Sequence, residues 1–329
     1  MKHSRRHVLL GLGAAAGLGG RVCAAGAEGR RLSQRLGVQL YVLGQAPMPG
    51  RAPPADLPQG LKALSDIGYR EVEGAPPGFT AEAYRRELDR VNLACPSIHT
   101  SLEPMDGVQS LADLPNAIAY AKTVGARNLV VATLPFRRLL ANRPDAEALF
   151  GDMKRLSAAV LDLTKSMSAD DWIAFARELN ASGAKLATAG LRLGYHNHNS
   201  EFVVLPSGQR AYDLLVAETD PKLVDFELDV GWARSAGLDP AALIKRYAKR
   251  ITQLHLKDLA DTPANTSAKL NSAEMGQGVQ DWNALLDAIS SSSVAHVYVE
   301  QEPPYPLSGL SSATAAYAFL QPRLAQKGL

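Results

Sequence analysis

The stretch Leu191–Glu201, LRLGYHNHNSE, places two histidines and a glutamate directly after a short apolar run. The segment Leu191–Asn197 has the length and composition of a buried strand, so the polar residues fall where that strand would end. Imidazole and carboxylate groups are candidate metal ligands and proton carriers. Their significance depends on which other groups the chain brings to the same place.

Short apolar runs of this kind alternate with amphipathic stretches along the chain. The expected strands are Val38–Leu43, Arg70–Gly74, Ala94–Thr100, Asn128–Leu134, Leu191–Asn197, Val224–Val230, Ile251–Asp258 and Val297–Glu302. The expected helices are Leu57–Ile67, Thr80–Val91 (with Thr80 as its N-cap), Leu111–Val124, Ser168–Ser182, Arg210–Ala217, Pro240–Ala248, Trp282–Ser290 and Ser311–Leu324. Alternating strands and helices predict a parallel sheet. Eight such pairs predict an α/β fold of one domain, a closed (β/α)₈ TIM barrel.

Two connections are expected at the mouth of this barrel. The longer one, Pro135–Met167, has no strand but contains an apolar helical patch, Ala146–Leu163. The other, Thr262–Gly278, is polar and carries two glycines near its end. Connections of this length are more often functional than not.

The composition excludes some classes of function. The chain of 329 residues is 46% hydrophobic and 21% charged, which is typical of a globular protein. Its 35 basic and 33 acidic residues give a net charge of +2, with no dense basic block, so a nucleic-acid partner is not expected. The motifs GxGxxG after the first strand and GxxxxGK[ST] are both missing, which removes the main support for dinucleotide and P-loop sites.

The first residues predict an export signal. Arg5 and Arg6 precede an apolar, glycine-rich run, and Ala25–Ala27 offers a small-residue cleavage site. The run Val8–Gly20 is too short for a membrane-spanning helix, which needs about 20 apolar residues. Cys23 is not preceded by the small residues of a lipid-attachment site.

We therefore expect a twin-arginine signal peptide over residues 1–27 and the barrel over residues 28–329. This division predicts a periplasmic protein without a stable membrane anchor.

Polar residues cluster where the expected strands end. In TIM barrels the active site lies at the carboxyl ends of the strands. The residues at or just beyond these ends are Glu73, His99, His196, His198, Glu201, Asp229, Trp232, His255, Lys257, Asp258, Glu300 and Glu302. Each one alone has an ordinary explanation, such as an aspartate that caps the next helix. Their coincidence at strands five to eight predicts a divalent-metal site, which would stabilise an enediolate next to a carbonyl.

Several of these stretches resemble one family. They are GYHNHNSEF, ELDVGWARSAG, RITQLHLKDL, MGQGVQDW and VYVEQE, with VQLYVLG near the start. They resemble the sugar phosphate isomerase/epimerase family of xylose isomerase-like barrels over nearly all of the chain after residue 36. The family includes keto-sugar 3-epimerases, inosose dehydratases and enzymes that cleave 3-keto-glycosides. The resemblance implies one divalent ion, Mn²⁺ first, with Zn²⁺, Co²⁺ or Mg²⁺ as alternatives.

The resemblance also implies a ligand set with one residue from each of strands five to eight. Asp229, His255 and Glu300 match the ligands of strands six, seven and eight. The strand-five ligand in many members is a glutamate in the pattern ENH. Here His196 stands at that position, and Glu201 is the nearby carboxylate that could reach back instead. In the epimerases the glutamate ligands also move protons, which makes Glu201 and Glu300 candidate catalytic residues.

Other roles follow from position. His198 either orients the strand-five ligand or acts as a general base. Lys257 is expected to polarise a developing oxyanion. Glu73 and His99 are expected to hydrogen-bond substrate hydroxyls. Trp232 either stacks on a sugar ring or packs under a loop.

The leading hypothesis is a metal-dependent isomerase or epimerase that removes a proton next to the carbonyl of a sugar or keto-sugar. Its alternative, with the same site, is an elimination: a 3-keto-glycoside lyase or hydrolase, or an inosose-type dehydratase.

A phosphodiesterase like the related apurinic-site endonucleases needs more histidines and a basic face. A non-catalytic carbohydrate-binding barrel would not need the ligand set. The expected partner is a small carbohydrate, and family barrels often form homo-oligomers.

Overall fold

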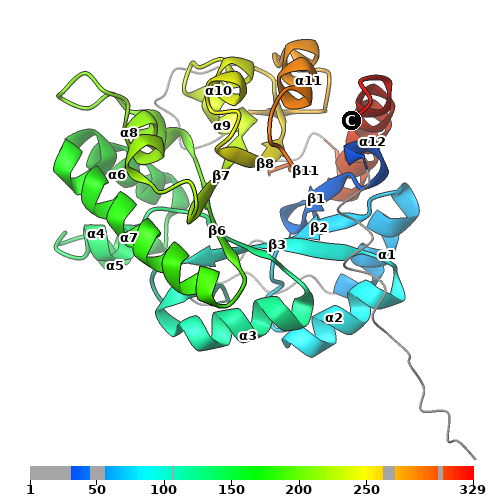
Figure 1. Cartoon of the computed structure of the whole chain (residues 1–329), viewed down its shortest axis with the longest axis horizontal. Helices are drawn as coiled ribbons and strands as arrows, with labels where there is room; N and C mark the ends of the chain where they lie inside the picture. The colour runs from blue at the N-terminus through cyan, green and yellow to red at the C-terminus, as the bar shows by residue number, and fades with distance from the viewer. Residues whose placement is uncertain (1–30, 45–55, 106, 262–270, 303–306) are drawn as a thin grey trace, which may run out of the picture.

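Eight parallel strands close into a barrel that is surrounded by helices (Figure 1). The computed structural model describes residues 31–44, 56–105, 107–261, 271–302 and 307–329. The barrel strands are β1 (Gly37–Gln39), β2 (Glu71–Glu73), β3 (Ala94–Ser101), β5 (Asn128–Val131), β6 (Arg192–His196), β7 (Val224–Asp229), β8 (Ile251–Leu256) and β11 (His296–Val299). The pairing of β2 with β3 closes the ring, so the predicted (β/α)₈ barrel is confirmed.

All eight expected helices have a counterpart on the outside of the barrel. They are α1 (Leu57–Ile67), α2 (Ala81–Arg90), α3 (Leu114–Val124), α7 (Ala169–Thr188), α8 (Ala211–Glu218), α10 (Pro240–Arg246), α11 (Trp282–Ser290) and α12 (Gly309–Gln326). The predicted N-cap Thr80 accepts a hydrogen bond from the Ala83 N–H at 3.2 Å. No helix among the described residues is long and apolar enough to cross a bilayer. The predicted signal peptide, residues 1–27, lies outside the described residues.

Some strands end earlier than expected. The first ends at Gln39, because the Gln39 side chain accepts the N–H of Tyr41 and the chain turns into a 3₁₀ helix, Leu40–Leu43. The eighth ends at Val299, so Glu300 lies in the segment that follows β11 rather than in the strand. Apolar residues continue after Gln39, which is why the sequence pattern overestimates the first strand. The eighth expected strand instead extends over the polar residues Glu300–Glu302, which lie beyond β11.

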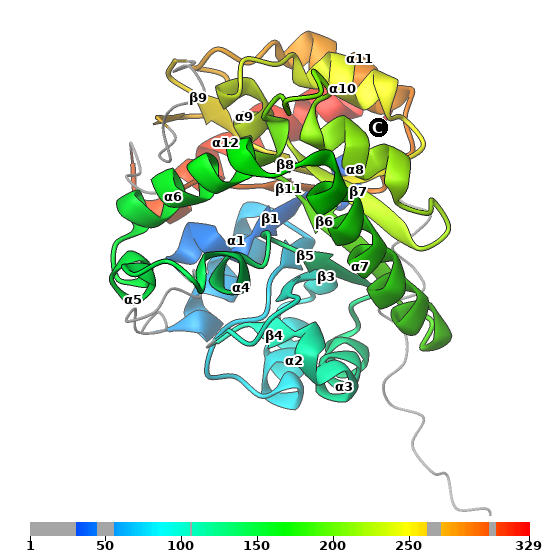
Figure 2. The same cartoon turned by 90° about the vertical axis from the view of Figure 1, so that its left-hand side faces the viewer.

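The long connection after β5 folds into three helices. They are α4 (Phe136–Leu140), α5 (Ala146–Phe150) and α6 (Met153–Ser166), which lie together on one side of the barrel (Figure 2). They bury a small apolar cluster of their own, including Leu140, Leu149 and Leu156. Helix α6 contacts the 3₁₀ turn Asn199–Phe202 that follows β6. The connection therefore reaches the carboxyl end of the barrel, as expected.

Alternation along the strands decides which side chains enter the barrel. On β7, Phe226 faces outward, where its ring lies 5.5 Å from that of Tyr212 on α8. On β6, Tyr195 likewise packs against Phe175 of α7 at 5.4 Å. Because successive side chains point to opposite faces, the neighbours of these aromatic residues point toward the barrel axis.

Asp258 organises the connection between β8 and α11. One carboxylate oxygen accepts the N–H groups of Gly276 at 2.9 Å and Gly278 at 3.2 Å, and the indole N–H of Trp282 at 2.9 Å. The other accepts the N–H of Gln280 at 3.1 Å. A Cβ at position 278 would lie 2.2 Å from the carboxylate, so this approach requires glycine. Of the expected mouth loop Thr262–Gly278, residues 262–270 lie outside the described residues.

We predict that Asp258→Ala lowers the free energy of unfolding by about 3–5 kcal/mol, because several buried N–H donors lose their acceptor. Urea denaturation followed by circular dichroism measures the loss. The control is Asp281→Ala, which removes the exposed N-cap of α11 and should cost about 1 kcal/mol. Equal losses in the two variants would contradict the role of Asp258.

Candidate metal centre

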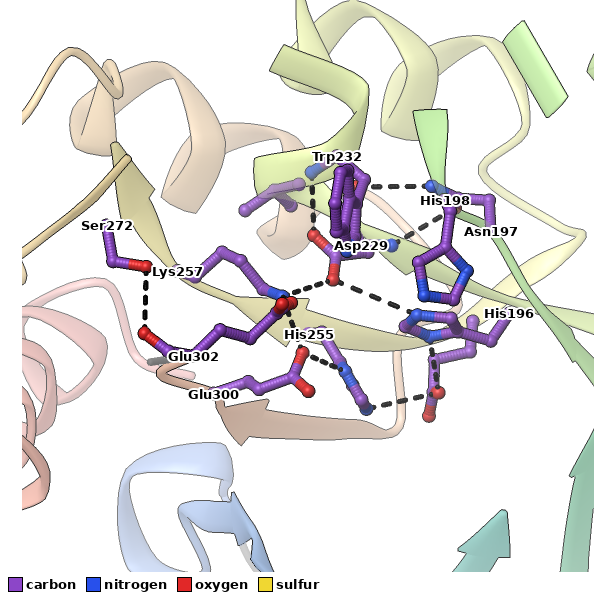
Figure 3. A network of polar contacts seen from close by, with 12 residues as sticks. His196, Asn197, His198, Asp229, Trp232, His255, Lys257, Ser272, Glu300 and Glu302 are labelled. Carbon is purple, nitrogen blue, oxygen red and sulfur yellow. Dashed lines mark hydrogen bonds and ion pairs between the residues drawn. The ribbon is translucent and has the colours of Figure 1, made fainter. Parts of the chain in front are cut away.

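Ionisable side chains from six strand ends meet inside the carboxyl end of the barrel. They are Glu73, His99, His196, Glu227, Asp229, His255, Lys257, Glu300 and Glu302. Figure 3 shows His196, Asp229, His255, Lys257 and Glu300 pointing toward one another. We call Asp229, Lys257, Glu300 and Glu302 the lysine cluster, and Glu73, His99, His196 and Glu227 the histidine cluster. His255 lies between the two clusters.

The lysine cluster surrounds one buried ammonium group. Lys257 Nζ lies 2.9 Å from Asp229 Oδ2, 2.7 Å from Glu300 Oε2 and 2.6 Å from Glu302 Oε1. The Lys257 side chain is only 1% exposed. Its stem passes over Gly231, where a Cβ would lie 2.2 Å from Lys257 Cγ. The glycine is therefore needed for the ammonium to reach the carboxylates.

The histidine cluster converges on one carboxylate oxygen. Glu227 Oε1 lies 2.9 Å from His99 Nε2, 3.0 Å from His196 Nδ1 and 3.1 Å from His255 Nε2. Glu73 Oε2 lies 2.5 Å from the same nitrogen of His255. The second oxygen of Glu227 is buried and has no hydrogen-bond partner among the described residues.

Two imidazoles connect the clusters. His255 turns Nε2 toward Glu73 and Glu227, and its Nδ1 lies 2.8 Å from Glu300 Oε2. His196 turns Nδ1 toward Glu227, and its Nε2 lies 3.9 Å from Asp229 Oδ2. Each ring therefore has one nitrogen in each cluster.

Burial and pairing set the charges. Burial raises the pKa of Asp229 to about 7, although the nearby Lys257 ammonium acts in the opposite direction. Burial alone would lower the pKa of Lys257, but Asp229, Glu300 and Glu302 raise it well above its ordinary value. Burial would also lower the pKa of His255, and the surrounding carboxylates, Glu227 first, raise it well above its ordinary value. These pairings therefore favour a charged lysine and a charged imidazole at the site.

Glu201 does not join either cluster. Its carboxylate accepts hydrogen bonds from Tyr195 Oη at 2.7 Å, the His198 N–H at 2.9 Å and Ser200 Oγ at 2.9 Å. These bonds fix the turn after β6. Of the two candidates for the strand-five ligand, the structure brings only His196 to the lysine cluster.

His198 and Trp232 lie at the edge of the lysine cluster. Their rings are 5.2 Å apart, and the ring of His198 is 5.1 Å from that of His196. Burial lowers the pKa of His198, so this imidazole is neutral near pH 7. Trp232 is 5% exposed and packs with Leu259, which favours the packing alternative over stacking on a sugar.

The residues expected to bind substrate hydroxyls are differently placed. Glu73 is fully buried, and its carboxylate is engaged by Ser97 Oγ at 2.5 Å as well as by His255. It is therefore not free for a substrate. The side chain of His99 is 18% exposed. Glu227 was not predicted, although its position two residues before Asp229 on the same strand places it on the same inner face.

The chemistry of the lysine cluster fits a divalent ion. Asp229, His255 and Glu300 each offer one ligand atom, and these atoms lie within 4.8 Å of one another. Asp229 Oδ2 is buried and pairs with the Lys257 ammonium at 2.9 Å. Carboxylate oxygens and imidazole nitrogens suit Mn²⁺ and Zn²⁺. Lys257 Nζ lies 2.9 Å from Asp229 Oδ2 and 2.7 Å from Glu300 Oε2, so an ion held by these two ligands would take the place of the ammonium.

A separate cavity of about 370 Å³ lies at the other end of the barrel. It is lined by residues at the starts of strands, among them Asn128, Arg192 and Asp225. Residues at this end of a TIM barrel serve stability rather than catalysis. The candidate site is therefore the pair of clusters at the carboxyl end.

The raised pKa of Asp229 predicts a pH effect on the metal-free protein. Between its ordinary pKa of 3.8 and its folded value of about 7, the folded state holds a proton that the unfolded state has lost. The contribution of Asp229 to stability is therefore highest at low pH and falls as pH rises from about 4 to about 7, by up to about 1.4 kcal/mol per pH unit.

Asp229→Asn has no such proton to lose, so its stability relative to wild type should rise across that window. Urea unfolding in the presence of a chelator, at intervals from pH 4 to pH 8, measures the difference. Asp281→Asn, which changes an exposed N-cap of the same type, is the control. A difference that does not vary with pH would contradict the prediction.

The fold and site can be compared with known proteins. A family model described as the xylose isomerase-like TIM barrel matches residues 61–321. An inosose dehydratase of Lacticaseibacillus casei is 26% identical over 162 residues, which cover 45% of this chain and 53% of that enzyme. The chain thus spans about half the length of the curated relatives that it matches.

Solved structures align over more of the chain. A sugar phosphate isomerase/epimerase of Parabacteroides distasonis has a TM-score of 0.65 at 22% identity, covering 92% of this chain and 98% of that one. The IOLI protein, solved with a bound zinc atom, has a TM-score of 0.56 at 14% identity, covering 89% and 98%. At these identities the structures support the fold alone. With the family model covering most of its length, the chain belongs to the xylose isomerase-like TIM barrel family.

Proposed function

We propose that this protein is a divalent-metal-dependent enzyme that removes a proton next to the carbonyl of a keto-sugar or keto-cyclitol. The observation that carries the proposal is that one ligand atom each from Asp229, His255 and Glu300 lies within 4.8 Å of the others at the mouth of the barrel. Asp229 and Glu300 also pair there with the buried ammonium of Lys257. The inosose dehydratase among the relatives and the zinc atom of the IOLI protein support the substrate class and the metal.

Asp229, His255 and Glu300 would hold the ion, with His196 as a fourth ligand. A bound divalent ion supplies Lewis acidity that stabilises negative charge on the substrate oxygens. Mn²⁺ is the first candidate, and Zn²⁺, Co²⁺ and Mg²⁺ are alternatives.

The remaining groups handle protons and charge. His198 is the general base, because its imidazole is neutral near pH 7 and lies beside the ring of His196. The ammonium of Lys257 hydrogen-bonds the developing oxyanion. It stays in reach of Glu302, with which it is already paired at 2.6 Å. The low solvent exposure of these groups strengthens their electrostatic effect.

Elimination is the favoured outcome. The base takes the proton next to the carbonyl, and the electron pair of the C–H bond forms an enediolate. The carbonyl then re-forms, the electron pair of the enediolate double bond moves to join the two carbons beyond the carbonyl, and the C–O bond on the second of these carbons breaks. The leaving oxygen takes the proton that the base removed. His196 replaces the strand-five glutamate of the two-carboxylate epimerases, so a second carboxylate for reprotonation from the opposite face is missing at that position. This difference favours an inosose-type dehydratase or a 3-keto-glycoside lyase.

Isomerisation or epimerisation is the second candidate. The carboxylate expected at the end of the eighth strand, Glu300, is retained and lies in the lysine cluster. The sugar phosphate isomerase/epimerase of Parabacteroides distasonis has the same fold. The twin-arginine sequence supports a further part of the proposal, that the protein is exported to the periplasm and acts on a substrate without phosphate.

The metal prediction can be checked by elemental mass spectrometry. We expect about one equivalent of Mn, Zn or Co in purified wild type, and its loss in Asp229→Ala and His255→Ala. Glu201→Gln is the control, because Glu201 lies outside both clusters and this variant should keep the metal. Wild type that binds no metal after reconstitution would contradict the proposal and favour a carbohydrate-binding barrel.

The reaction can be followed by NMR in D₂O with keto-inositols, 3-keto-glycosides and keto-sugars. We expect exchange of the proton next to the carbonyl together with an unsaturated product. His198→Gln should lower the exchange rate by about 10²–10⁴-fold, the usual contribution of a general base. A product that differs only in configuration would replace elimination with epimerisation. A catalytic rate that His198→Gln leaves unchanged would contradict the assignment of the base.

A further inference from the structure

Glu227 is a buried carboxylate for which the proposed reaction has no use. It is fully buried on the inner face of β7, one layer below Asp229. An unpaired buried carboxylate costs several kcal/mol, so its presence in the barrel interior needs partners. Its Oε1 atom is within 3.1 Å of nitrogens from three different strands: His99, His196 and His255.

The hydrogen bond at one nitrogen of an imidazole decides what the other nitrogen can do. A neutral ring carries one N–H, and only the nitrogen without hydrogen can bind a metal. A carboxylate that accepts the N–H therefore fixes the tautomer and the orientation of the ring.

The two connecting histidines follow this rule. His196 donates Nδ1–H to Glu227 at 3.0 Å, which leaves Nε2 facing Asp229 Oδ2 at 3.9 Å. His255 directs Nε2–H to Glu227 at 3.1 Å and to Glu73 at 2.5 Å. The charged ring also donates Nδ1–H to Glu300 Oε2 at 2.8 Å, so Nδ1 is the nitrogen that would give up its proton to an ion while Glu227 keeps Nε2–H. In both rings the nitrogen that does not face Glu227 faces the lysine cluster, where the metal is proposed to bind.

We propose that Glu227 is a positioning residue that selects the metal-facing nitrogens of His196 and His255. Glu73 supports it at His255. The inference deepens the proposed function and rests on it, because it concerns the same metal site. Glu227 does not touch the substrate or the ion but acts through the two imidazoles.

The competing account is a second metal ion within the histidine cluster itself. One ligand atom each from His99, His196, Glu227 and His255 does lie within 4.8 Å of the others. We prefer positioning, because Glu227 Oε1 already lies 2.9–3.1 Å from a nitrogen of each ring, as a shared hydrogen-bond acceptor does. An ion that bound those nitrogens would have to replace these hydrogen bonds and would leave Glu227 as a ligand. The two accounts differ in the number of ions bound.

The test compares metal-free wild type with Glu227→Gln by calorimetric titration with Mn²⁺ and by visible spectroscopy with Co²⁺. The glutamine keeps the size of the side chain but removes the charge that holds the N–H groups. We expect binding to weaken about 10- to 100-fold, the usual effect of losing such a carboxylate, with one ion still bound. The Co²⁺ absorption bands should also shift, since they report the ligand geometry rather than overall stability.

Glu71→Gln is the matched control. Glu71 is also a buried carboxylate of the barrel that pairs with a histidine, His296 at 2.8 Å, but it lies outside both clusters. Its substitution should lower stability without changing the Mn²⁺ affinity or the Co²⁺ spectrum. A comparable loss of affinity in this control would show that the effect of Glu227→Gln is general destabilisation and would overturn the inference.

Three further results would overturn it. One is that wild type binds Mn²⁺ tightly and Glu227→Gln binds it equally tightly. In that case Glu227 has no positioning role, and the proposed function stands. If wild type binds two ions and Glu227→Gln binds one, Glu227 is a ligand rather than a positioning residue. Wild type that binds no ion would overturn the proposed function and this inference together.

Discussion

The ion pairs of the buried Lys257 ammonium with Asp229, Glu300 and Glu302 are the interaction on which the carboxyl end of this barrel depends. Three carboxylates this close together would repel one another strongly when ionised, unless a positive charge lay among them. Lys257 supplies that charge in the metal-free protein, and a divalent ion is proposed to supply it in the loaded one. The carboxylates thus favour a bound cation of either kind. We propose that Lys257 pairs with Asp229 and Glu300 when no divalent ion is bound, and that it turns toward the substrate when one is.

The carboxylates of the histidine cluster, one layer deeper in the barrel, also need partners because they are buried. Glu73 and Glu227 are as deeply buried as the proposed ligands, and each is paired with imidazole nitrogens. Since His255 and His196 touch both layers, the charge state of one cluster is linked to that of the other. This arrangement explains why a barrel interior that could be filled with apolar side chains keeps two carboxylates below the proposed metal site.

The barrel could be predicted from the sequence because the patterns that mark strands and helices depend only on residues that are close together along the chain. The alternation of short apolar runs with helical stretches identified all eight strands and all eight expected helices. It failed at the strand ends, where the chain leaves the sheet for reasons that lie in local hydrogen bonds, such as the one that the Gln39 side chain accepts from the Tyr41 N–H. Apolar composition does not reveal where the ladder of a neighbouring strand stops.

Part of the site was predictable because the carboxyl ends of the barrel strands could be located from the same local patterns. A search of the last residue of each strand found His196, Asp229 and His255, but missed Glu227, which lies one layer below. Glu73 and Glu201 were found as strand-end carboxylates, yet one is engaged by Ser97 and His255 and the other by the turn after β6. Which partner takes a carboxylate depends on tertiary distances, which a strand-end rule does not contain.

The most direct test of this account is a crystal structure of the protein soaked with Mn²⁺, with the ion located by anomalous scattering. The account predicts one ion bound by Asp229, His255 Nδ1 and Glu300, with the ammonium of Lys257 withdrawn from Asp229. An ion bound elsewhere, or a mouth in which Lys257 stays between Asp229 and Glu300 at saturating Mn²⁺, would contradict it.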